Sequence, residues 1–191
     1  MSFTTITKAA ALAAFMSTAS IYAIPAIGQE MTVEVGGAPM YPSKNIIENA
    51  VNSKDHTTLV AAVQAGGLVE TLSGAGPFTV FAPVNAAFEA LPDGTVETLL
   101  KPENKEMLVK ILTCHVVAAN AMSDAVKQMV MDDGGTHEVT TVGGCKLWLS
   151  TEGDVIKVKD ENGGTATVTI ADVAQSNGVI HVVDAVLLPK M

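Results

Sequence analysis

The stretch that decides the fold reads Gly76-Pro77-Phe78-Thr79-Val80-Phe81-Ala82-Pro83-Val84-Asn85-Ala86-Ala87-Phe88. In an extended chain, Phe78, Val80 and Ala82 face one side, and Thr79 and Phe81 face the other. Neither side carries a charge. We therefore expect a short strand that is covered on both faces and lies at the centre of the fold.

The end of this strand is marked by Pro83. Proline has no N–H to donate to a ladder and biases Ala82 toward an extended conformation, so strand pairing should stop there. Asn85 stands where a helix cap would be, which predicts a helix that begins at 86 and contains Phe88.

A second stretch of the same character lies near the end of the chain. Asn177-Gly178 predicts a turn, the run from Val179 to Leu188 is apolar on both faces, and Pro189 ends it. The acid in this run is Asp184, which must find donors or lie near the solvent end of the strand.

The remaining pattern changes period once along the chain. Helical spacing predicts helices at 46–51, 59–67, 68–72, 95–100, 102–112 and 123–133, with a strand at 114–117. From 136 onward the period is two, which predicts hairpins of 137–142 with 145–150, turning at Gly143-Gly144, and of 155–159 with 165–170. This order predicts a single α+β domain over 43–191. The segment before it, 29–42, is expected to be either a partly disordered lead-in or an edge segment.

The composition argues against nucleic-acid binding. Lysine supplies all 11 basic residues, there is no arginine, and the net charge is -9. Arginine's planar fork is the usual reader of phosphates and base edges, and an acidic surface repels polyanions.

Residues 1–28 have the layout of a secretory signal peptide. Lys8 gives a weakly basic start, 9–16 is apolar, and small residues follow, with cleavage expected after Ala23 or Gly28. The alternative is an uncleaved membrane anchor, against which polar residues and Pro25 interrupt the apolar run. We expect the mature chain to be secreted or periplasmic, without a stable membrane anchor.

The two cysteines are Cys114 and Cys145. In an exported protein such a pair favours a disulfide, and the alternative is two buried free thiols.

The chain resembles fasciclin (FAS1) domains at two ordered signatures, and the resemblance covers 43–189. The first is Thr79-Val80-Phe81-Ala82-Pro83 followed by Asn85 and Phe88, and the second is Asn177-Gly178-Val179-Ile180-His181-Val182-Val183-Asp184, continuing to Leu187-Leu188-Pro189. Between them, 112–117 matches the position of the family's Tyr-His motif. The chain is similar to single-domain secreted bacterial members.

The resemblance implies a wedge-shaped β-sandwich with a helical layer, its two signature strands adjacent in the core. It also implies cell adhesion or extracellular interactions without catalysis or a cofactor. The sequence departs from the family at Cys114, which replaces the tyrosine before His115, and at Val84 and Asn85, which replace Thr and Asp. A role of that tyrosine in adhesion therefore does not transfer.

One candidate adhesion contact comes from the resemblance alone. In animal members, Asp-Ile segments before the second signature have been proposed as integrin contacts, and Asp172-Val173 occupies the corresponding place. The alternative, which we favour for a bacterial-type chain, is a turn residue that caps the segment after a strand at 165–170.

The histidines show no metal-ligand spacing. His115 and His181 fall in predicted interior strands, where a neutral, hydrogen-bonded imidazole is the simplest expectation. A contact of either histidine with Asp184 stays open. No nucleophile motif, phosphate loop or metal cluster is present in the sequence, so an enzyme is the least favoured reading.

Two further groups of residues have two readings each. The methionines of two predicted helices either fill a core that is poor in aromatics or form an adaptable surface; they are Met107, Met122, Met129 and Met131. The acidic pairs Asp132-Asp133 and Asp160-Glu161 should be solvated in turns, with weak calcium binding as the alternative.

Two functions follow from the sequence. The first is an exported, non-catalytic module that binds a surface protein or glycan, with weak self-association open. The second is a periplasmic carrier of a small apolar molecule, in a crevice between the Met-rich helices and the sheet.

Overall fold

The centre of the fold is a pair of parallel strands. A computed structural model describes residues 32–92 and 94–190. In it, β3 (Phe78–Pro83) pairs with β9 (Gly178–Val183) in a register that runs from Phe78↔Gly178 to Pro83↔Val183. The two signature strands are therefore adjacent, as predicted, and β9 lies between β3 and β8.

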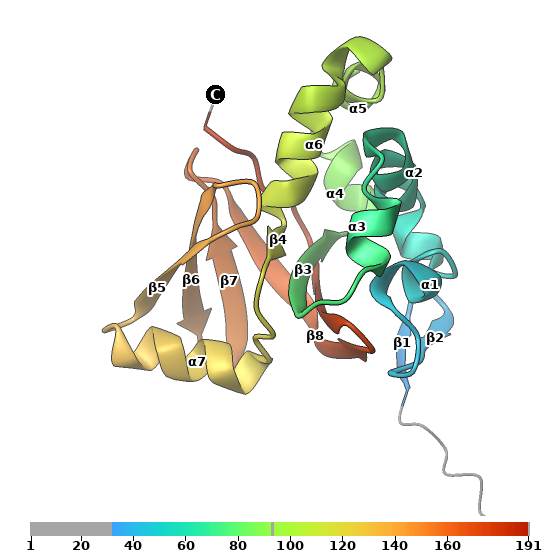
Figure 1. Cartoon of the computed structure of the whole chain (residues 1–191). Helices are drawn as coiled ribbons and strands as arrows, with labels where there is room; N and C mark the ends of the chain where they lie inside the picture. The colour runs from blue at the N-terminus through green and yellow to red at the C-terminus, as the bar shows by residue number, and fades with distance from the viewer. Residues whose placement is uncertain (1–31, 93, 191) are drawn as a thin grey trace, which may run out of the picture.

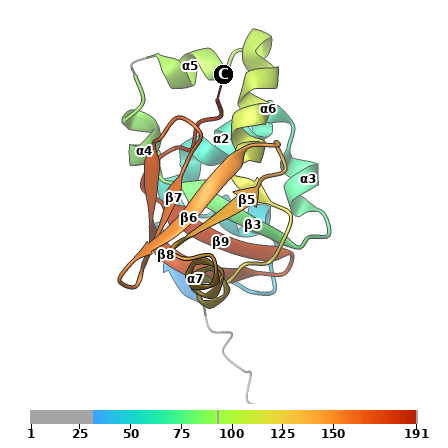
Figure 2. The same ribbon diagram turned by 90° about the vertical axis from the view of Figure 1, so that its left-hand side faces the viewer.

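These two strands belong to a seven-stranded sheet of order β4-β3-β9-β8-β7-β6-β5. All neighbours except β3 and β9 are antiparallel. The other strands are β4 (Val116–Val117), β5 (Thr136–Thr140), β6 (Lys146–Glu152), β7 (Val155–Lys159) and β8 (Thr165–Gln175). The sheet curves until it is nearly closed, and Figure 2 shows β5 and β6 toward the viewer.

The helices fall into two groups (Figure 1). Most of them form a layer beside β3: α1 (Ile46–Ala50), η1 (Lys54–His56), α2 (Thr57–Gly66), α3 (Val69–Ser73), α4 (Asn85–Glu89), α5 (Thr95–Leu99), η2 (Pro102–Asn104) and α6 (Lys105–Cys114). By contrast, α7 (Ser123–Asp132) lies across the ends of β5, β6 and β7.

The two faces of β3 enter two different cores. Val80 and Ala82 pack in the helix-side core, which includes Leu59, Val63 and Leu112. Phe81 packs in the sheet-side core, a cluster formed by α7 and the inner face of β6, β7 and β8, with members Val126, Val130, Leu147, Leu149, Ile156 and Val158. This confirms the prediction of a strand covered on both faces.

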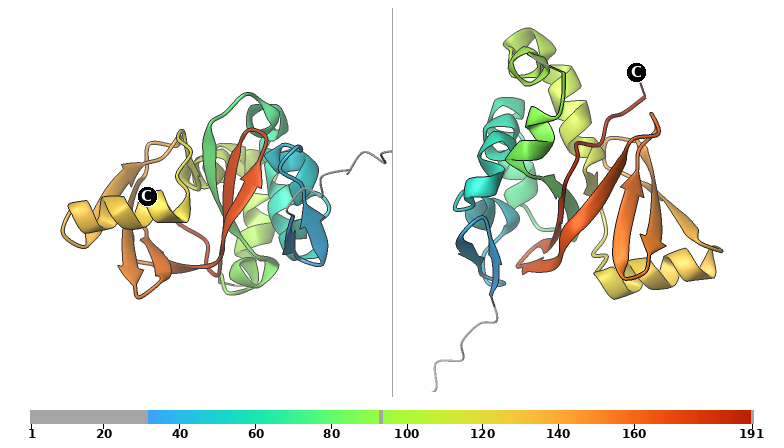
Figure 3. Two further views of the ribbon diagram at one scale, coloured as in Figure 1. Left: turned by 90° about the horizontal axis from the view of Figure 1, so that it is seen from below. Right: turned by 180° about the vertical axis from the view of Figure 1, so that it is seen from behind.

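Part of the expected lead-in forms a hairpin. β1 (Val33–Val35) pairs with β2 (Ala38–Met40), and Val35, Ala38 and Met40 are buried in the helix-side core. Figure 3 shows this hairpin and α7 at opposite sides of the molecule. The described part of 29–42 is therefore packed on the domain. The predicted signal peptide lies outside the described residues.

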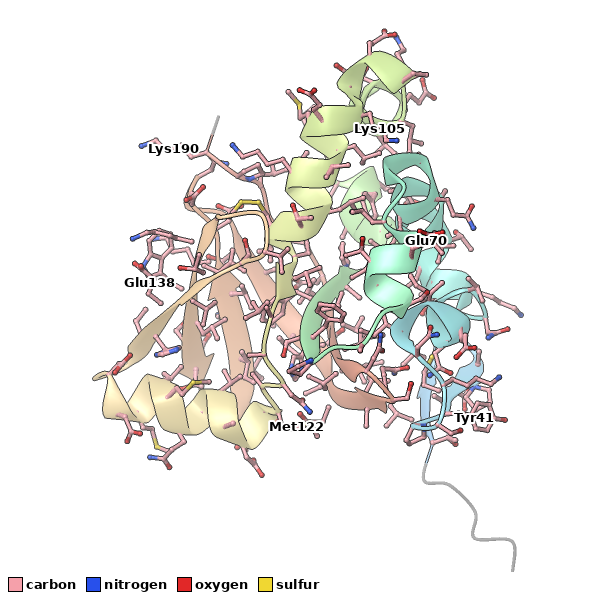
Figure 4. All side chains as sticks on the ribbon, viewed as in Figure 1. Tyr41, Glu70, Lys105, Met122, Glu138 and Lys190 are labelled. Carbon is pink, nitrogen blue, oxygen red and sulfur yellow. A yellow bond between two sulfur atoms is a disulfide. The ribbon has the colours of Figure 1, made fainter. Side chains whose placement is uncertain are left out.

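The two edges of the sheet are joined at one end. The N–H groups of Val142 and Gly143, in the loop after β5, donate to the carbonyls of Val116 and Thr113 at 2.7 and 3.0 Å. A disulfide links Cys114 to Cys145 across the same junction, with 5.4 Å between the Cα atoms (Figure 4). The structure thus contains the disulfide that the sequence favoured over free thiols, and it fastens α6 to the loop beyond β5.

Two local predictions were wrong. The segment expected as a strand at 114–117 is helical through Cys114, and only Val116–Val117 form a strand. The hairpin expected to turn at two glycines has a longer loop, because β5 and β6 pair last at Thr140↔Lys146 and the Thr141 N–H then donates to the carbonyl of Cys145.

Within 32–92 and 94–190, every helix is too short or too polar to span a lipid bilayer.

Candidate interaction surface

The signature residues of β3 hold the two cores and one loop together. Pro83 ends the strand and is buried, and Phe88 packs partly buried against the helix-side core. The hydroxyl of Thr79 donates to the carbonyl of Ala119 at 2.6 Å and accepts from the N–H of Ala121 at 2.9 Å. These residues therefore position the segment between β4 and α7.

Asn85 caps a different helix from the one predicted. The cap of α4 is Val84, which makes no side-chain bond. The Asn85 carbonyl oxygen instead accepts from the N–H of Thr58 at 3.0 Å, and its amide donates to the carbonyl of Lys54 at 2.8 Å. Asn85 thus satisfies an N–H in the first turn of α2, which begins 28 residues earlier at Thr57.

Asn177 joins three segments of the chain. Its side-chain oxygen accepts from the N–H of Ile46 at 3.1 Å, and its amide donates to the carbonyls of Leu72 and Gly74 at 2.8 and 2.9 Å. The next residue, Gly178, lies against Phe78, and a Cβ there would overlap the Phe78 carbonyl. This dipeptide therefore fixes β9 against β3 and the helical layer.

The sequence suggested that His115 lies in an interior strand, but it is a buried helix cap. It is the C-cap of α6; Nδ1 donates to the carbonyl of Ile111 at 2.8 Å, and Nε2 accepts from the N–H of Leu187 at 2.9 Å. The Leu187 bond requires the proton to sit on Nδ1. Burial lowers the pKa of His115 to about 4, although the Ile111 carbonyl and Asp160 act in the opposite direction.

His181 is also neutral and buried. The N–H of Asp172 donates to Nδ1 at 3.3 Å, Nε2 donates to the carbonyl of Ala121 at 2.8 Å, and the ring stacks on Phe81 with centroids 5.9 Å apart. Burial lowers the pKa of His181, while the Ala121 carbonyl and the Asp172 carboxylate partly offset that effect.

The Asp172-Val173 segment lies inside β8, at an irregularity where the register shifts between Ile170 and Val173. Asp172 has a φ of 59°, and its carboxylate accepts from the N–H of Ser123 at 2.6 Å and from the Ser123 hydroxyl. Val173 is 1% exposed. Asp172 thus anchors the start of α7 and does not cap a turn, and a partner contact here would need this carboxylate to leave Ser123.

Of the remaining acids, Asp184 lies as the sequence predicted, near the solvent end of its strand with a donor, whereas Asp160 does not lie in a solvated turn. Asp184 is exposed at the end of β9 and accepts from the N–H of Thr167 at 2.6 Å, so neither histidine contacts it. Asp160, expected in a solvated turn, is 3% exposed and accepts from the N–H groups of Gly164 and Leu188 at 2.8 and 2.9 Å. It ties the C-terminal segment to the turn before β8.

The described residues contain no cluster of three or more His, Cys, Asp or Glu side chains that could hold a metal ion. Of the four methionines with two readings, Met107, Met122 and Met131 are exposed, and Met129 packs partly buried against the sheet-side core. None of these four lines the apolar cavity of the helix-side core. The apolar cavity therefore does not coincide with the crevice that we expected between the Met-rich helices and the sheet.

The outer face of the sheet carries a hollow around Trp148, the single tryptophan of the chain. Leu147 and Leu149 point into the sheet-side core, so Trp148 between them faces outward and is half-buried. It lies in register with Glu138 of β5 and Lys159 of β7. Sequence reasoning missed this residue, although the alternation around it would have placed it outside.

Polar groups surround the indole. The hollow is lined by Thr136, Trp148, Ser150, Lys159, Asp160, Glu161, Asn162 and Gly163, and its volume is about 580 Å³. Glu161 is held in place because its carboxylate accepts from the N–H groups of Lys146 and Lys190 at 3.2 and 2.9 Å. These two bonds, the Lys190 bond being the larger cause, lower the pKa of Glu161, so the hollow keeps a fixed negative charge.

The hollow brings a half-buried indole together with hydroxyl, amide, ammonium and carboxylate groups, a combination that can contact a ligand. Among the residues that the structure describes, Nε2 of His56 is the one buried side-chain nitrogen or oxygen without a hydrogen-bond partner.

Comparison with known proteins identifies the family. Residues 54–189 match the model of the Fasciclin domain. The chain is 47% identical over 162 residues to Protein sll1483 of Synechocystis sp., covering 85% of this chain and 83% of that one. It is 35% identical over 145 residues to Immunogenic protein MPB70 of Mycobacterium bovis, covering 73% and 66%.

A solved structure has the same fold. The FAS1 domain pair from the insect cell adhesion molecule fasciclin I superimposes with a TM-score of 0.55 at 26% identity, covering 68% of this chain and 43% of that one. This chain belongs to the fasciclin (FAS1) domain family, whose members are generally non-catalytic.

Proposed function

We propose that this protein is an exported FAS1 interaction module that binds a protein or glycan of the cell envelope or its surroundings without catalysis. The observation that carries the proposal is the half-buried Trp148 in its polar hollow. Tryptophan is enriched among the residues that dominate binding energy, because it offers a large rigid face at small entropic cost. In a chain with 4% aromatic residues, leaving this side chain on the surface favours a binding role.

The charge of the chain narrows the partner. Cleavage after Gly28 would remove Lys8 and leave 10 lysines against 20 acids, a net charge of -10. Such a surface disfavours polyanions. Around the indole, Lys159 offers a positive donor, Glu161 a negative acceptor and Asn162 a neutral amide. These groups suit a neutral or basic partner, such as an uncharged glycan or a lysine-bearing protein surface.

The disulfide supports an exported location. Cys114 and Cys145 form a disulfide. Disulfides persist in oxidising compartments and are rare in the cytosol. The family relationship to a cell adhesion molecule supports the same assignment.

The test is a crosslinking pull-down from the native envelope with mature chain. We expect wild type to retain a saturable partner, Trp148→Ala to lose at least tenfold in affinity, and Met107→Ala to bind normally because Met107 is exposed on α6 in the helical layer. If Trp148→Ala retained the partner as well as wild type does, the hollow would not be the binding site. If no partner bound at micromolar concentration, including a second copy of the chain, the proposed binding function would be wrong.

A further inference from the structure

The helix-side core contains a cavity of about 80 Å³. It lies between the hairpin β1–β2, the helices α1, α2 and α6, and the strands β3 and β9, with apolar walls that include Met40, Leu59, Val63, Leu112 and Ile180. Well-packed interiors rarely leave a space larger than a water molecule. A void of this size in a core is therefore a feature to explain.

One polar atom in the wall has no partner. His56 lines the cavity and is 3% exposed. Its Nδ1 shares a hydrogen bond of 2.9 Å with the Ser53 hydroxyl, whereas Nε2 is buried and meets no partner in hydrogen-bond geometry. The Ala82 carbonyl lies close enough to act as a weak acceptor and raise the pKa of the ring, but the contact does not meet the distance and angle of a hydrogen bond.

The ring is neutral in this setting. Burial lowers the pKa of His56, with smaller opposing effects from the Ala82 carbonyl and Asp55. Nε2 therefore offers one hydrogen bond: it donates if the Ser53 hydroxyl donates to Nδ1, and it accepts in the other tautomer. A ligand hydroxyl can meet either case.

Water alone fits this cavity poorly. A buried water typically makes about three hydrogen bonds. His115 also lines the wall, but both of its ring nitrogens are already bonded, and Ser53 already contacts His56. A water on Nε2 would face apolar side chains in its other directions.

We propose that this cavity is a binding site for a small uncharged molecule with an apolar body and one hydroxyl group, held by a hydrogen bond to Nε2 of His56. A charged ligand is excluded because the apolar walls could not replace its hydration. The size limit follows from the volume: a cavity of roughly 150 Å³ holds benzene. At about 80 Å³ the site fits a molecule of the size of a two- or three-carbon alcohol.

This site is independent of the Trp148 hollow, which lies on the outer face of β6 and shares no lining residue with the cavity. Its test uses the mature chain with two probes, xenon and 1-propanol, followed by methyl ¹³C and imidazole ¹⁵N NMR. Xenon reports the space alone. 1-Propanol reports the space and the hydrogen bond.

We expect both probes to give saturable shifts confined to the cavity methyl groups of Leu59, Val63 and Ile180, and 1-propanol alone to shift His56 Nε2. His56→Leu is close to histidine in volume and removes the nitrogen, so it should retain xenon and weaken 1-propanol at least fivefold. Val63→Phe should fill the space and lose both probes.

The wild-type titration decides the matter even if a variant fails to fold. Absence of saturable shifts with both probes would overturn the proposal, as would xenon binding without 1-propanol binding, which indicates a packing void only. A long-lived water detected at His56 that 1-propanol does not displace would also overturn it.

Discussion

His115 is the residue whose charge state the fold controls most strongly. Its two ring nitrogens join the end of α6 to the C-terminal segment through Ile111 and Leu187, and burial disfavours the charged ring. A proton added to Nε2 would face the Leu187 N–H and break that bond. The folded state therefore requires the neutral ring.

The first prediction concerns pH. The pKa of His115 is lowered from 6.5 to about 4, so the folded chain binds fewer protons than the unfolded chain in this interval. The contribution of the neutral His115 ring to the free energy of unfolding is therefore fully present above pH 6.5. It should fall by roughly 3 kcal/mol as the pH drops to 4. An NMR titration of the His115 ring should show a midpoint near pH 4, and a midpoint near 6.5 would contradict this account. His115→Phe supplies the control, because its stability curve should lack this component.

The second prediction concerns Asn85. Replacement by alanine leaves the Thr58 N–H and the Lys54 carbonyl without their partner and should cost about 1–2 kcal/mol. Hydrogen exchange should accelerate at Thr58 in α2, while the Ala87 N–H, which donates to the backbone of Val84, stays unchanged. Faster exchange at Ala87 alone would contradict this account and would support the sequence-based prediction that Asn85 caps α4. Asn85→Asp keeps the acceptor and should lose only part of the stability.

At the scale of elements, α7 depends on a carboxylate from β8. Asp172 accepts both the N–H and the hydroxyl of Ser123 at the first turn of the helix. We expect Asp172→Ala to destabilise the protein by about 1–3 kcal/mol and to raise exchange in α7 first. In a double-mutant cycle, Asp172 and Ser123 should couple by about 1 kcal/mol, and additive effects would show that the contact contributes nothing. Asp172→Asn tolerates the positive φ and is the matched control.

The disulfide acts on the junction between the two sheet edges. Cys114 and Cys145 are separated by 31 positions in the sequence, so the double Cys→Ala variant should lose about 3–4 kcal/mol. Denaturant unfolding measures this loss of stability. In the wild-type chain, thiol titration in denaturant should find no free thiol before reduction and two after it. A loss below about 1 kcal/mol would mean that Val142 and Gly143 hold the junction by their backbone bonds alone.

The elements that the sequence predicted well are those whose signal is local. β3 and β9 are apolar on both faces, which only interior strands allow, and the helix expected at 46–51 is α1, which opens with a capping box of Asn45 and Glu48. The strand expected at 114–117 was wrong because a short apolar run fits either a helix end or a strand. Its outcome depended on helix α6 continuing to Cys114.

The candidate sites depended on partners far apart in the sequence, which a local pattern does not contain. Asn85 meets a helix that precedes it by 28 residues, and Asp160 meets Leu188, also 28 residues away. His56 lies beside a void that forms only when the hairpin, α1 and α2 pack on the sheet. By contrast, Trp148 could have been assigned to the surface from the alternation of Leu147 and Leu149.

At the scale of the whole molecule, the two cores separate two roles. The shared strands β3 and β9 stabilise the domain, since each buries both faces and carries the family signatures. The outer face of β5, β6 and β7 is free to carry a binding surface without disturbing that centre. The acidic surface then favours neutral or basic partners, and such binding should change little with moderate salt if the indole face contributes most of the affinity.

The most direct test of the central claim uses the single tryptophan as its own reporter. The intrinsic fluorescence of the mature wild-type chain is titrated with envelope glycan fragments in one series and with purified envelope proteins in another. We predict a saturable blue shift with one of these partners, the same shift in Met107→Ala, and at least tenfold weaker binding of Trp148→Ala by calorimetry. A partner that binds with no change in Trp148 emission, and binds Trp148→Ala as tightly as wild type, would contradict the account.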